Sequence, residues 1–324
     1  MLQQRAEIYN LVKELAAKFH FADFGCAKAE EVSAAVQSAY LYAQKEGHFA
    51  SMHYLNNNIE KRFNPQLLVE GAQSVLVFLV PYSLPDNIPA PKGVAQYALG
   101  KDYHIVIKEK LFAIMESLKE RYPHFQGRAF TDSAPVMERE WGVRAALGFV
   151  GKNNFLISKS CGIKNFIATI ICNLDVASTD EMEPGKREAV TGRCGECSRC
   201  MENCPTKALK SEYTMDCRRC ISYHTIENRN LQQETEQGIL PTFGEQYFGC
   251  DNCLDACPWN SRNLPGWKEF HINAELLDKA TVQWWEGLSN EEFKKIFKES
   301  PLTRGGLENI QTALAWGKKG KENG

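Results

Sequence analysis

Nine of the twelve cysteines lie between Cys194 and Cys257, a concentration that is typical of metal binding. Disulfides are rare in a reducing cytosol, so clustered cysteines there are more often metal ligands or catalytic groups. The other three, Cys26, Cys161 and Cys172, stand in apolar surroundings and are predicted to be small buried side chains. The sequence therefore predicts a metal-binding segment in the second half of the chain.

Two cysteine motifs carry this prediction. The run C-x2-C-x2-C-x3-C-P at 194–205 has the spacing of bacterial ferredoxins, in which the fourth cysteine binds the other of two [4Fe–4S] clusters. The run C-x2-C-x3-C-P at 250–258 has the same ending but lacks one cysteine. Two cubanes need eight thiolates and the motifs supply seven, so Cys217 or Cys220 must provide the last. By the crossover rule one cluster takes Cys194, Cys197, Cys200 and Cys257, and the other takes Cys204, Cys250, Cys253 and one of that pair.

The alternative is a pair of structural zinc sites, because paired CxxC motifs also bind zinc. Zinc sites rarely show the full four-cysteine run followed by proline, and here the Cys-Pro ending occurs twice. We therefore expect iron–sulfur clusters.

The first half of the chain alternates helix and strand patterns. Residues 8–19 show the apolar spacing of a helix, and residues 74–82 form a short β-branched run typical of a buried strand. Asp102 is the expected N-cap of the next helix. Further strands are predicted at 127–132, 155–158 and 165–172, the last two as a hairpin across Gly162, with a helix from Pro135 to about Leu147. The pattern predicts an α/β or α+β layer domain.

Three domains are expected along the chain. Residues 1–185 form the α/β domain, residues 186–263 a ferredoxin-type two-cluster module, and residues 264–324 a helical tail with helices near 290–299 and 307–316. The polar segment 175–193 is predicted to be a linker or surface loop, and the charged end at 317–324 to be frayed.

The overall composition favours a cytoplasmic protein. The formal net charge is -2 and the pI is about 6.4, so nothing global indicates a polyanionic partner. The first ten residues do not resemble a signal peptide, and no stretch approaches the roughly 18 apolar residues of a membrane span. We expect a monomer without membrane contact.

Several segments, taken together, resemble epoxyqueuosine reductase, a family related to the corrinoid reductive dehalogenases. They are HYLNNNIEKRFNP (53–65), YALGKDYH (97–104), TDSAPVMEREWGVRAALGFVGKNNFLIS (131–158), CRRCISYHTIENR (217–229) and FGCDNCLDACPWN (248–260). The resemblance covers about 50–263 in the family's order. One departure is that Asp132-Ser-Ala-Pro stands where Asp-Thr-Gly-Pro is more usual.

The resemblance implies an oxidoreductase with cobalamin and two [4Fe–4S] clusters. Its substrate would be tRNA carrying epoxyqueuosine at the wobble position, which it would reduce to queuosine in the last step of queuosine biosynthesis. The resemblance also selects Cys220 as the eighth ligand and leaves Cys217 as a spare thiol. It assigns Asp132 as the proton donor, whereas the sequence alone favours a helix cap at this position.

Further contacts follow from the same resemblance. The cobalamin-binding residues would include Arg62, Tyr97, Asp132, Lys152, Asn153 and Ser222. The residues beside the cluster module that could meet tRNA phosphates are Arg218, Arg219, Asn228 and Arg229. Ordinary surface charges and a core aromatic would explain these positions almost as well. A flavodoxin- or ferredoxin-type protein is the expected electron donor.

Two other functions compete with this one. A corrinoid reductase of another class, such as a dehalogenase, would share both cofactors, but those enzymes usually carry a twin-arginine signal, which we do not find. A non-catalytic ferredoxin-type electron carrier would not need an N-terminal domain of about 180 residues.

Overall fold

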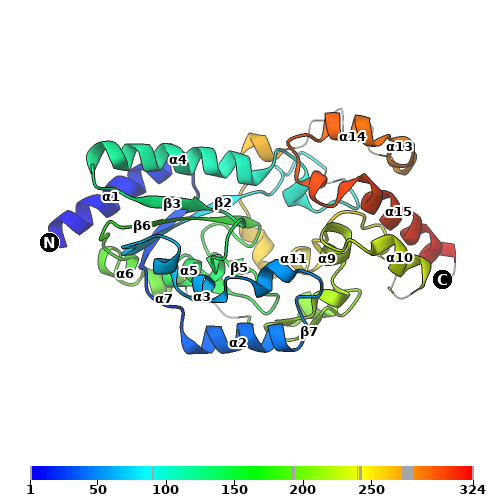
Figure 1. Cartoon of the computed structure of the whole chain (residues 1–324), viewed down its shortest axis with the longest axis horizontal. Helices are drawn as coiled ribbons and strands as arrows, with labels where there is room; N and C mark the ends of the chain where they lie inside the picture. Colours follow the sequence, from blue (N-terminus) through cyan, green and yellow to red (C-terminus); the bar gives the residue numbers. More distant parts are fainter. Residues whose placement is uncertain are drawn as a thin grey trace.

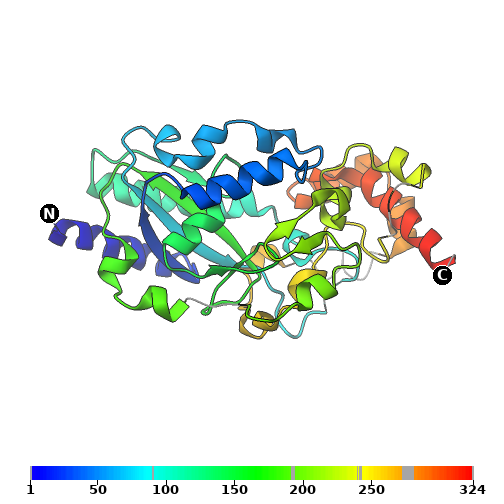
Figure 2. The same cartoon turned by 90° about the horizontal axis from the view of Figure 1, so that it is seen from below.

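The computed structural model of the chain describes residues 2–89, 91–190, 194–238, 240, 243–271 and 281–322. Figure 1 shows an elongated molecule with its two termini at opposite ends of the long axis. A β-sheet lies toward the N-terminal end, and the cysteine-bearing segment and the last helix lie toward the other end (Figure 2). None of the described helices is long and apolar enough to span a membrane.

The sheet has four strands in the order β1-β2-β6-β3, and all neighbouring strands are antiparallel. Its strands are β1 (Asp23–Lys28), β2 (Ser74–Pro81), β3 (Gly127–Phe130) and β6 (Asn165–Cys172). Successive residues of β2 point to opposite faces: Leu76 and Phe78 join one apolar core, whereas Val75 and Val77 join another. The continuous apolar run of β2 therefore reflects burial on both faces.

Helices cover both faces of this sheet (Figure 1). One face carries α1 (Leu2–Lys18) and α4 (Tyr103–Arg121), and the other carries α2 (Ala34–Lys45), α3 (Ile59–Phe63) and α5 (Glu138–Arg144). As predicted, the side chain of Asp102 caps α4 by accepting from the His104 N–H. The predicted mixed α/β architecture is confirmed, with an antiparallel sheet at its centre.

Two predicted elements differ from the structure. The helix expected from Pro135 begins at Glu138 and ends at Arg144, and its N-cap residue, Met137, makes no side-chain cap hydrogen bond. The predicted hairpin across Gly162 is wrong, because β5 (Leu156–Ile157) pairs with β4 (Phe149–Val150) while β6 pairs with β2 and β3. The apolar residues of β6 need cover on both faces, which a central position in the sheet provides and a hairpin does not.

The predicted linker at 175–193 contains two short helices, α6 (Thr179–Met182) and α7 (Lys186–Val190), while residues 191–193 lie outside the described part. Ser178 and Glu181 form a capping box at the start of α6. Arg5 ties this segment to α1 through ion pairs with Asp175 and Glu181.

The cysteine-bearing segment is built from short elements. They are α8 (Arg199–Glu202), β7 (Leu209–Ser211), β8 (Thr214–Met215), η4 (Cys217–Arg219), α9 (Ile221–Ile226), α10 (Leu231–Glu236), α11 (Asn252–Asp255) and η5 (Pro258–Arg262). The other short helices are η1 (His53–Asn56), η2 (Pro65–Leu67), η3 (Gln96–Ala98) and η6 (Lys268–Phe270). The C-terminal part contains α13 (Val282–Gly287), α14 (Asn290–Ile296), η7 (Pro301–Arg304) and α15 (Gly306–Glu322), which extends through most of the end expected to be frayed.

After η5 the chain returns to the sheet domain. Phe270 is 1% exposed and packs in the core beside Phe166, with 5.3 Å between ring centroids. The indole N–H of Trp267 donates to the carbonyl of His20. The first residues of the expected tail, up to 271, therefore belong to the core of the N-terminal part.

Candidate metal centre and active site

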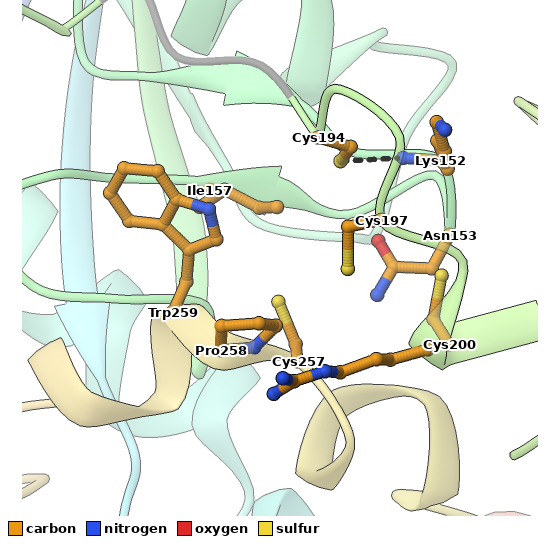
Figure 3. Close-up of a pocket in the computed structure, with 10 residues that line it drawn as sticks. Lys152, Asn153, Ile157, Cys194, Cys197, Cys200, Cys257, Pro258 and Trp259 are labelled. Atoms are coloured by element: carbon orange, nitrogen blue, oxygen red, sulfur yellow. Dashed lines mark hydrogen bonds between the residues drawn. The ribbon is translucent and has the colours of Figure 1, made fainter.

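Four thiols surround one cavity of about 160 Å³. They are Cys194, Cys197, Cys200 and Cys257, which we call the first cysteine set. Figure 3 shows their sulfur atoms around one open space, with Trp259 and Pro258 beside them. Four thiolates around a single zinc ion, each about 2.3 Å from it, would leave no such cavity. The space suits a larger inorganic group, and Cys257 completes the set as the crossover rule predicts.

A second group of thiols shares one buried environment. Cys204, Cys220, Cys250 and Cys253 form the second cysteine set. Burial raises the pKa of Cys253 well above its ordinary value, and Cys250, Cys220 and Cys204 raise it further by electrostatic repulsion. Burial likewise raises the pKa of Cys250 to about 12. Thiolates so disfavoured need a cation or metal cluster among them to remain ionised.

Cys220, and not Cys217, faces the second set. Cys220 interacts electrostatically with Cys204, Cys250 and Cys253, whereas the thiol that acts most on Cys217 is Cys220. Cys217 is 6% exposed, and burial raises its pKa to about 12. The position of Cys217 therefore suits an inert buried thiol.

Lys152 and Asn153 lie at the cysteine sets. The backbone N–H of Lys152 donates to Cys194 Sγ at 3.5 Å, and its Nζ bonds the Gly195 carbonyl and pairs with Glu212, both at 2.6 Å. Asn153 lines the first cavity and donates from Nδ2 to the carbonyl of Cys253 at 3.2 Å. The structure thus places both residues beside the cysteine sets, where they position the loops that carry the thiols.

Asp132 lies just beyond the carboxyl end of β3 and is exposed. Its backbone has a φ of 48°, in the left-handed region, so the loop is held by outside contacts. The hydroxyl of Tyr103 donates to Asp132 Oδ2 at 2.6 Å, and the Asp132 N–H donates to Glu138 Oε1 at 2.7 Å. Asp132 does not cap α5, so the interpretation as a helix cap is wrong.

The charged side chains beside Asp132 are at least partly exposed, yet desolvation by the surrounding protein shifts their pKa values. Burial, followed by the neighbouring Asp132 carboxylate, raises the pKa of Glu138 to about 8. Arg139 is exposed by area, yet the protein around it lowers its pKa by desolvation. We call Asp132 with its neighbours Tyr103, Glu138 and Arg139 the Asp132 recess; perturbed pKa values such as these are typical of sites of proton chemistry.

Tyr97 connects this recess with the second cysteine set. Its ring lies edge-on to Tyr103 with 6.1 Å between centroids, and a methyl on Gly249, next to Cys250, would lie 3.6 Å from it. The segment before Tyr97 is fixed by Asp251, whose Oδ2 accepts from the Gln96 N–H at 2.7 Å. Ser222 lies two residues after Cys220, and its polar groups lower the pKa of that thiol, which burial raises.

Arg62 stands apart from the cysteine sets. It is 9% exposed and stacks on Tyr40 at 5.3 Å, and its Nε has no hydrogen-bond partner among the described residues. The charge of Arg139 also acts on Tyr40. A buried guanidinium with an unused donor suits a polar ligand.

The four predicted tRNA contacts have different environments. Asn228 is 1% exposed and bonds Glu234 and His224, so its side chain has an internal role. Arg218 is paired with Asp216 at 2.8 Å, and Arg219 donates to the Thr206 carbonyl. Arg229 is exposed and donates to the carbonyl of Arg304.

Tyr103, Glu138 and Arg139 were not singled out by the sequence, although they frame Asp132. Tyr103 lies in the quoted YALGKDYH run, and its position directly after an N-cap was the available signal. Glu138 gave no usable signal, because an acidic residue in the first turn of a helix is expected on electrostatic grounds alone.

Comparisons with known proteins agree with this geometry. A family model described as "4Fe-4S double cluster binding domain" matches residues 193–260, and one described as "Epoxyqueuosine reductase QueG, DUF1730" matches residues 62–133. An epoxyqueuosine reductase of Cyclobacterium marinum is 37% identical over 93% of this chain and 94% of its own length. One of Pseudomonas aeruginosa is 33% identical over 84% of this chain and 74% of its own.

Solved structures show the same fold. A crystal structure of epoxyqueuosine reductase superimposes with a TM-score of 0.80 at 26% identity, covering 97% of this chain and 84% of the other. Another, determined with an epoxyqueuosine-modified tRNA-Tyr stem loop, gives a TM-score of 0.79 at 25% identity, with 97% and 83% covered.

Proposed function

This chain belongs to the epoxyqueuosine reductase family, and from that premise we propose how its residues carry out the reduction of epoxyqueuosine to queuosine in tRNA. The observation that supports the proposal most is the continuous series of contacts from the cysteine sets through Tyr97 and Tyr103 to Asp132.

The reaction consumes two electrons and two protons. Both C–O bonds of the epoxide break, a carbon–carbon double bond forms between the two ring carbons, and the oxygen leaves as water. The protein must therefore deliver electrons one at a time, supply protons at the departing oxygen, and keep bulk water from the reduced centre.

The two cysteine sets hold two [4Fe–4S] clusters in this proposal. Electrons from a flavodoxin- or ferredoxin-type donor enter at the first set, where Cys194 and Cys197 are only half-buried. They pass to the second set, to which Asn153 is hydrogen-bonded from the first cavity. Tyr97, beside the second set, leads to the Asp132 recess.

Cobalamin fits this recess in part. Arg62 with its unused Nε, the half-buried Tyr97, and Ser222 next to Cys220 would hold it on the side facing the second set. Lys152 and Asn153 are engaged at the cysteine sets, so their contribution would be through the loops they position. When bound, the cofactor supplies a strongly reducing cobalt centre.

Asp132 is the proton donor to the departing oxygen. It is exposed in the recess, and two hydrogen bonds fix it: the Tyr103 hydroxyl orients the carboxyl and Glu138 holds the backbone. Such a fixed acid typically accelerates proton-coupled steps by about 10²–10⁴-fold.

Nucleoside analysis of tRNA tests the function. Cells that lack this protein and any second reductase should accumulate epoxyqueuosine, and unchanged queuosine would refute the assignment. A visible spectrum of anaerobically purified protein tests the cofactors: cluster bands that do not respond to added cobalamin would indicate an electron carrier instead.

A further inference from the structure

An exposed aromatic ring and an arginine from distant parts of the chain meet at the surface. Tyr54, in η1, is 49% exposed, and the guanidinium of Arg304, in η7, lies 5.9 Å from the centre of its ring. An exposed aromatic ring beside a guanidinium plane offers two flat surfaces on which another flat group can stack.

The backbone on each side of the pair is held by hydrogen bonds to other elements. The carbonyl of Leu55 accepts from the Tyr40 hydroxyl at 2.6 Å, and Ser51 bonds the Tyr223 hydroxyl at 2.6 Å. On the other side, Arg229 donates to the carbonyl of Arg304. The two surfaces are therefore ordered before any ligand arrives, which lowers the entropic cost of binding.

Glu227 determines how Arg304 can be used. Its two carboxylate oxygens accept from Nε and Nη2 of Arg304, each at 2.9 Å, which fixes the guanidinium plane and neutralises its charge. The Arg304 side chain is still 54% exposed. A neutralised, planar and exposed group is better suited to stacking on a flat ring than to binding a phosphate.

The Asp132 carboxylate acts electrostatically on both members of the pair. Although Tyr54 is exposed, desolvation by the protein raises its pKa to about 12, with further contributions from the Glu227 and Asp132 carboxylates. The charge of Asp132 also acts on Arg304, whose pKa is raised chiefly by its hydrogen bonds to Glu227.

We propose that Tyr54 and Arg304 form a stacking platform for an unpaired nucleotide of the tRNA anticodon loop at the entrance to the Asp132 recess. The inference rests on the proposed function, since it concerns the RNA that carries the substrate base. Unpaired bases are commonly bound on aromatic rings and guanidinium planes, because every base has a flat π-face.

Binding of an epoxyqueuosine-containing anticodon stem loop to the cofactor-loaded enzyme tests the platform, with fluorescence anisotropy as the readout. Tyr54→Ala and Arg304→Ala should each weaken binding roughly 5- to 150-fold, as for the loss of one stacked base. Tyr54→Phe retains the ring and should bind like the wild type. Arg128→Ala is the matched control, because Arg128 also stacks on an aromatic ring, Phe130, but lies on strand β3.

Glu227→Gln separates stacking from phosphate binding. It frees the charge of Arg304 and loosens its plane, so the platform predicts weaker binding, whereas a phosphate contact predicts tighter binding. The dependence of affinity on salt should also keep the same slope in Arg304→Ala, since a neutralised arginine releases few counterions. Tighter binding by Glu227→Gln, or wild-type affinity in both alanine variants, would overturn the platform.

Failure of the platform is distinct from failure of the proposed function. If the wild-type enzyme reduces the modified stem loop but the alanine variants bind it normally, only the platform is wrong. If the wild-type enzyme binds the stem loop and leaves it unreduced, the function is wrong. Unfolding temperatures of all variants show whether a loss of binding reflects a loss of folding.

Discussion

At the scale of single residues, Asp132 is held by two helices that begin on either side of it. Tyr103 is the first residue of α4 and Glu138 the first of α5, and they bond its carboxyl and its N–H respectively. A left-handed aspartate on an exposed loop would otherwise sample other conformations at little cost. The geometry of the proposed proton donor therefore depends on Tyr103 and Glu138.

Removal of the acid should slow turnover sharply without loss of the bound cofactors. Asp132→Asn is expected to lower the rate of epoxide reduction by about 10²–10⁴-fold, because the amide cannot deliver a proton. Tyr103→Phe should cost roughly tenfold, the effect of one orienting hydrogen bond. Single-turnover assays with matched cluster content check this, and full activity in Asp132→Asn would exclude it as the donor.

Glu138 should make stability depend on pH in a definite direction. Its pKa of about 8 in the folded protein exceeds the ordinary value of about 4.3, so the folded state holds this proton more tightly than the unfolded chain. Stability should therefore fall as the pH rises from about 4.3 through 8. Glu138→Gln cannot ionise, and its unfolding temperature relative to wild type should increase between pH 5.5 and 8.5.

The control for this measurement is Glu116→Gln, which removes an exposed carboxylate from α4. The difference in unfolding temperature between this variant and the wild type should stay constant over the same pH range. A constant difference for Glu138→Gln as well would contradict the assignment of the pH dependence to this residue.

The eighth cluster ligand can be identified by a matched pair of variants. Cys220→Ser should lose iron and the absorption of one cluster, because Cys220 faces Cys204, Cys250 and Cys253. Cys217→Ser should retain the iron content of the wild type, since that thiol is buried outside the set. The reverse result would exchange their roles.

At the scale of elements, the central strands position the loop that carries Asp132. β2 and β3 both run antiparallel to β6, so their carboxyl ends lie at the same edge of the sheet, and Asp132 follows the end of β3. Thr131 anchors that edge by donating to the carbonyl of Ile167 on β6. Helix α5 packs against β1 closely enough that only a glycine fits at Gly25.

A methyl group at Gly25 should destabilise this packing. In Gly25→Ala the new Cβ would collide with the carbonyl oxygen of Ala145, which is backbone and cannot move aside easily. We expect a loss of about 1–3 kcal/mol in the free energy of unfolding, measured by urea denaturation. Gly287→Ala, with no atom within 4 Å of its new Cβ, should be close to neutral.

Many of the helices and strands could be predicted from local sequence patterns. The predictions that failed did so for physical reasons. The apolar run of β2 and the Asp102 cap depend on neighbouring residues alone, and both were predicted correctly. The partner of β6 depends on which surfaces need cover in three dimensions, and the hairpin prediction failed for that reason. The cysteine spacing predicted the first set, whereas Tyr54 and Arg304 meet only through tertiary folding.

At the scale of the whole molecule, several contacts among the described residues join the sheet domain to the cysteine-bearing and C-terminal parts. Residues 265–271 pack Phe270 into the sheet core, and Gly266 donates to the carbonyl of Ser83. Ala98 enters the C-terminal core with Phe248 and Ile310. Tyr223 of α9 bonds Ser51. These connections keep the cysteine sets and the recess at a fixed separation.

Loss of the Phe270 anchor should weaken this connection. Phe270→Ala is expected to destabilise the protein by about 3–5 kcal/mol, because the ring is 1% exposed and packs on Phe166 and Trp267. Trypsin should also cleave faster at the adjacent Lys268. Ile296→Ala, at a residue 41% exposed on α14, should change stability by less than about 0.5 kcal/mol, and an equal loss there would contradict the role of the anchor.

Each proposed ligand set takes cysteines from both motifs, and this determines when a cluster can be inserted during synthesis. The first cysteine set includes Cys257, and the second includes Cys250 and Cys253. Neither set is therefore complete while the ribosome is still synthesising residues before 250. Iron delivery to a nascent chain that ends at Cys204 would find only part of each site. In the proposed arrangement, both clusters would be inserted only after translation of the second motif, and at nearly the same moment.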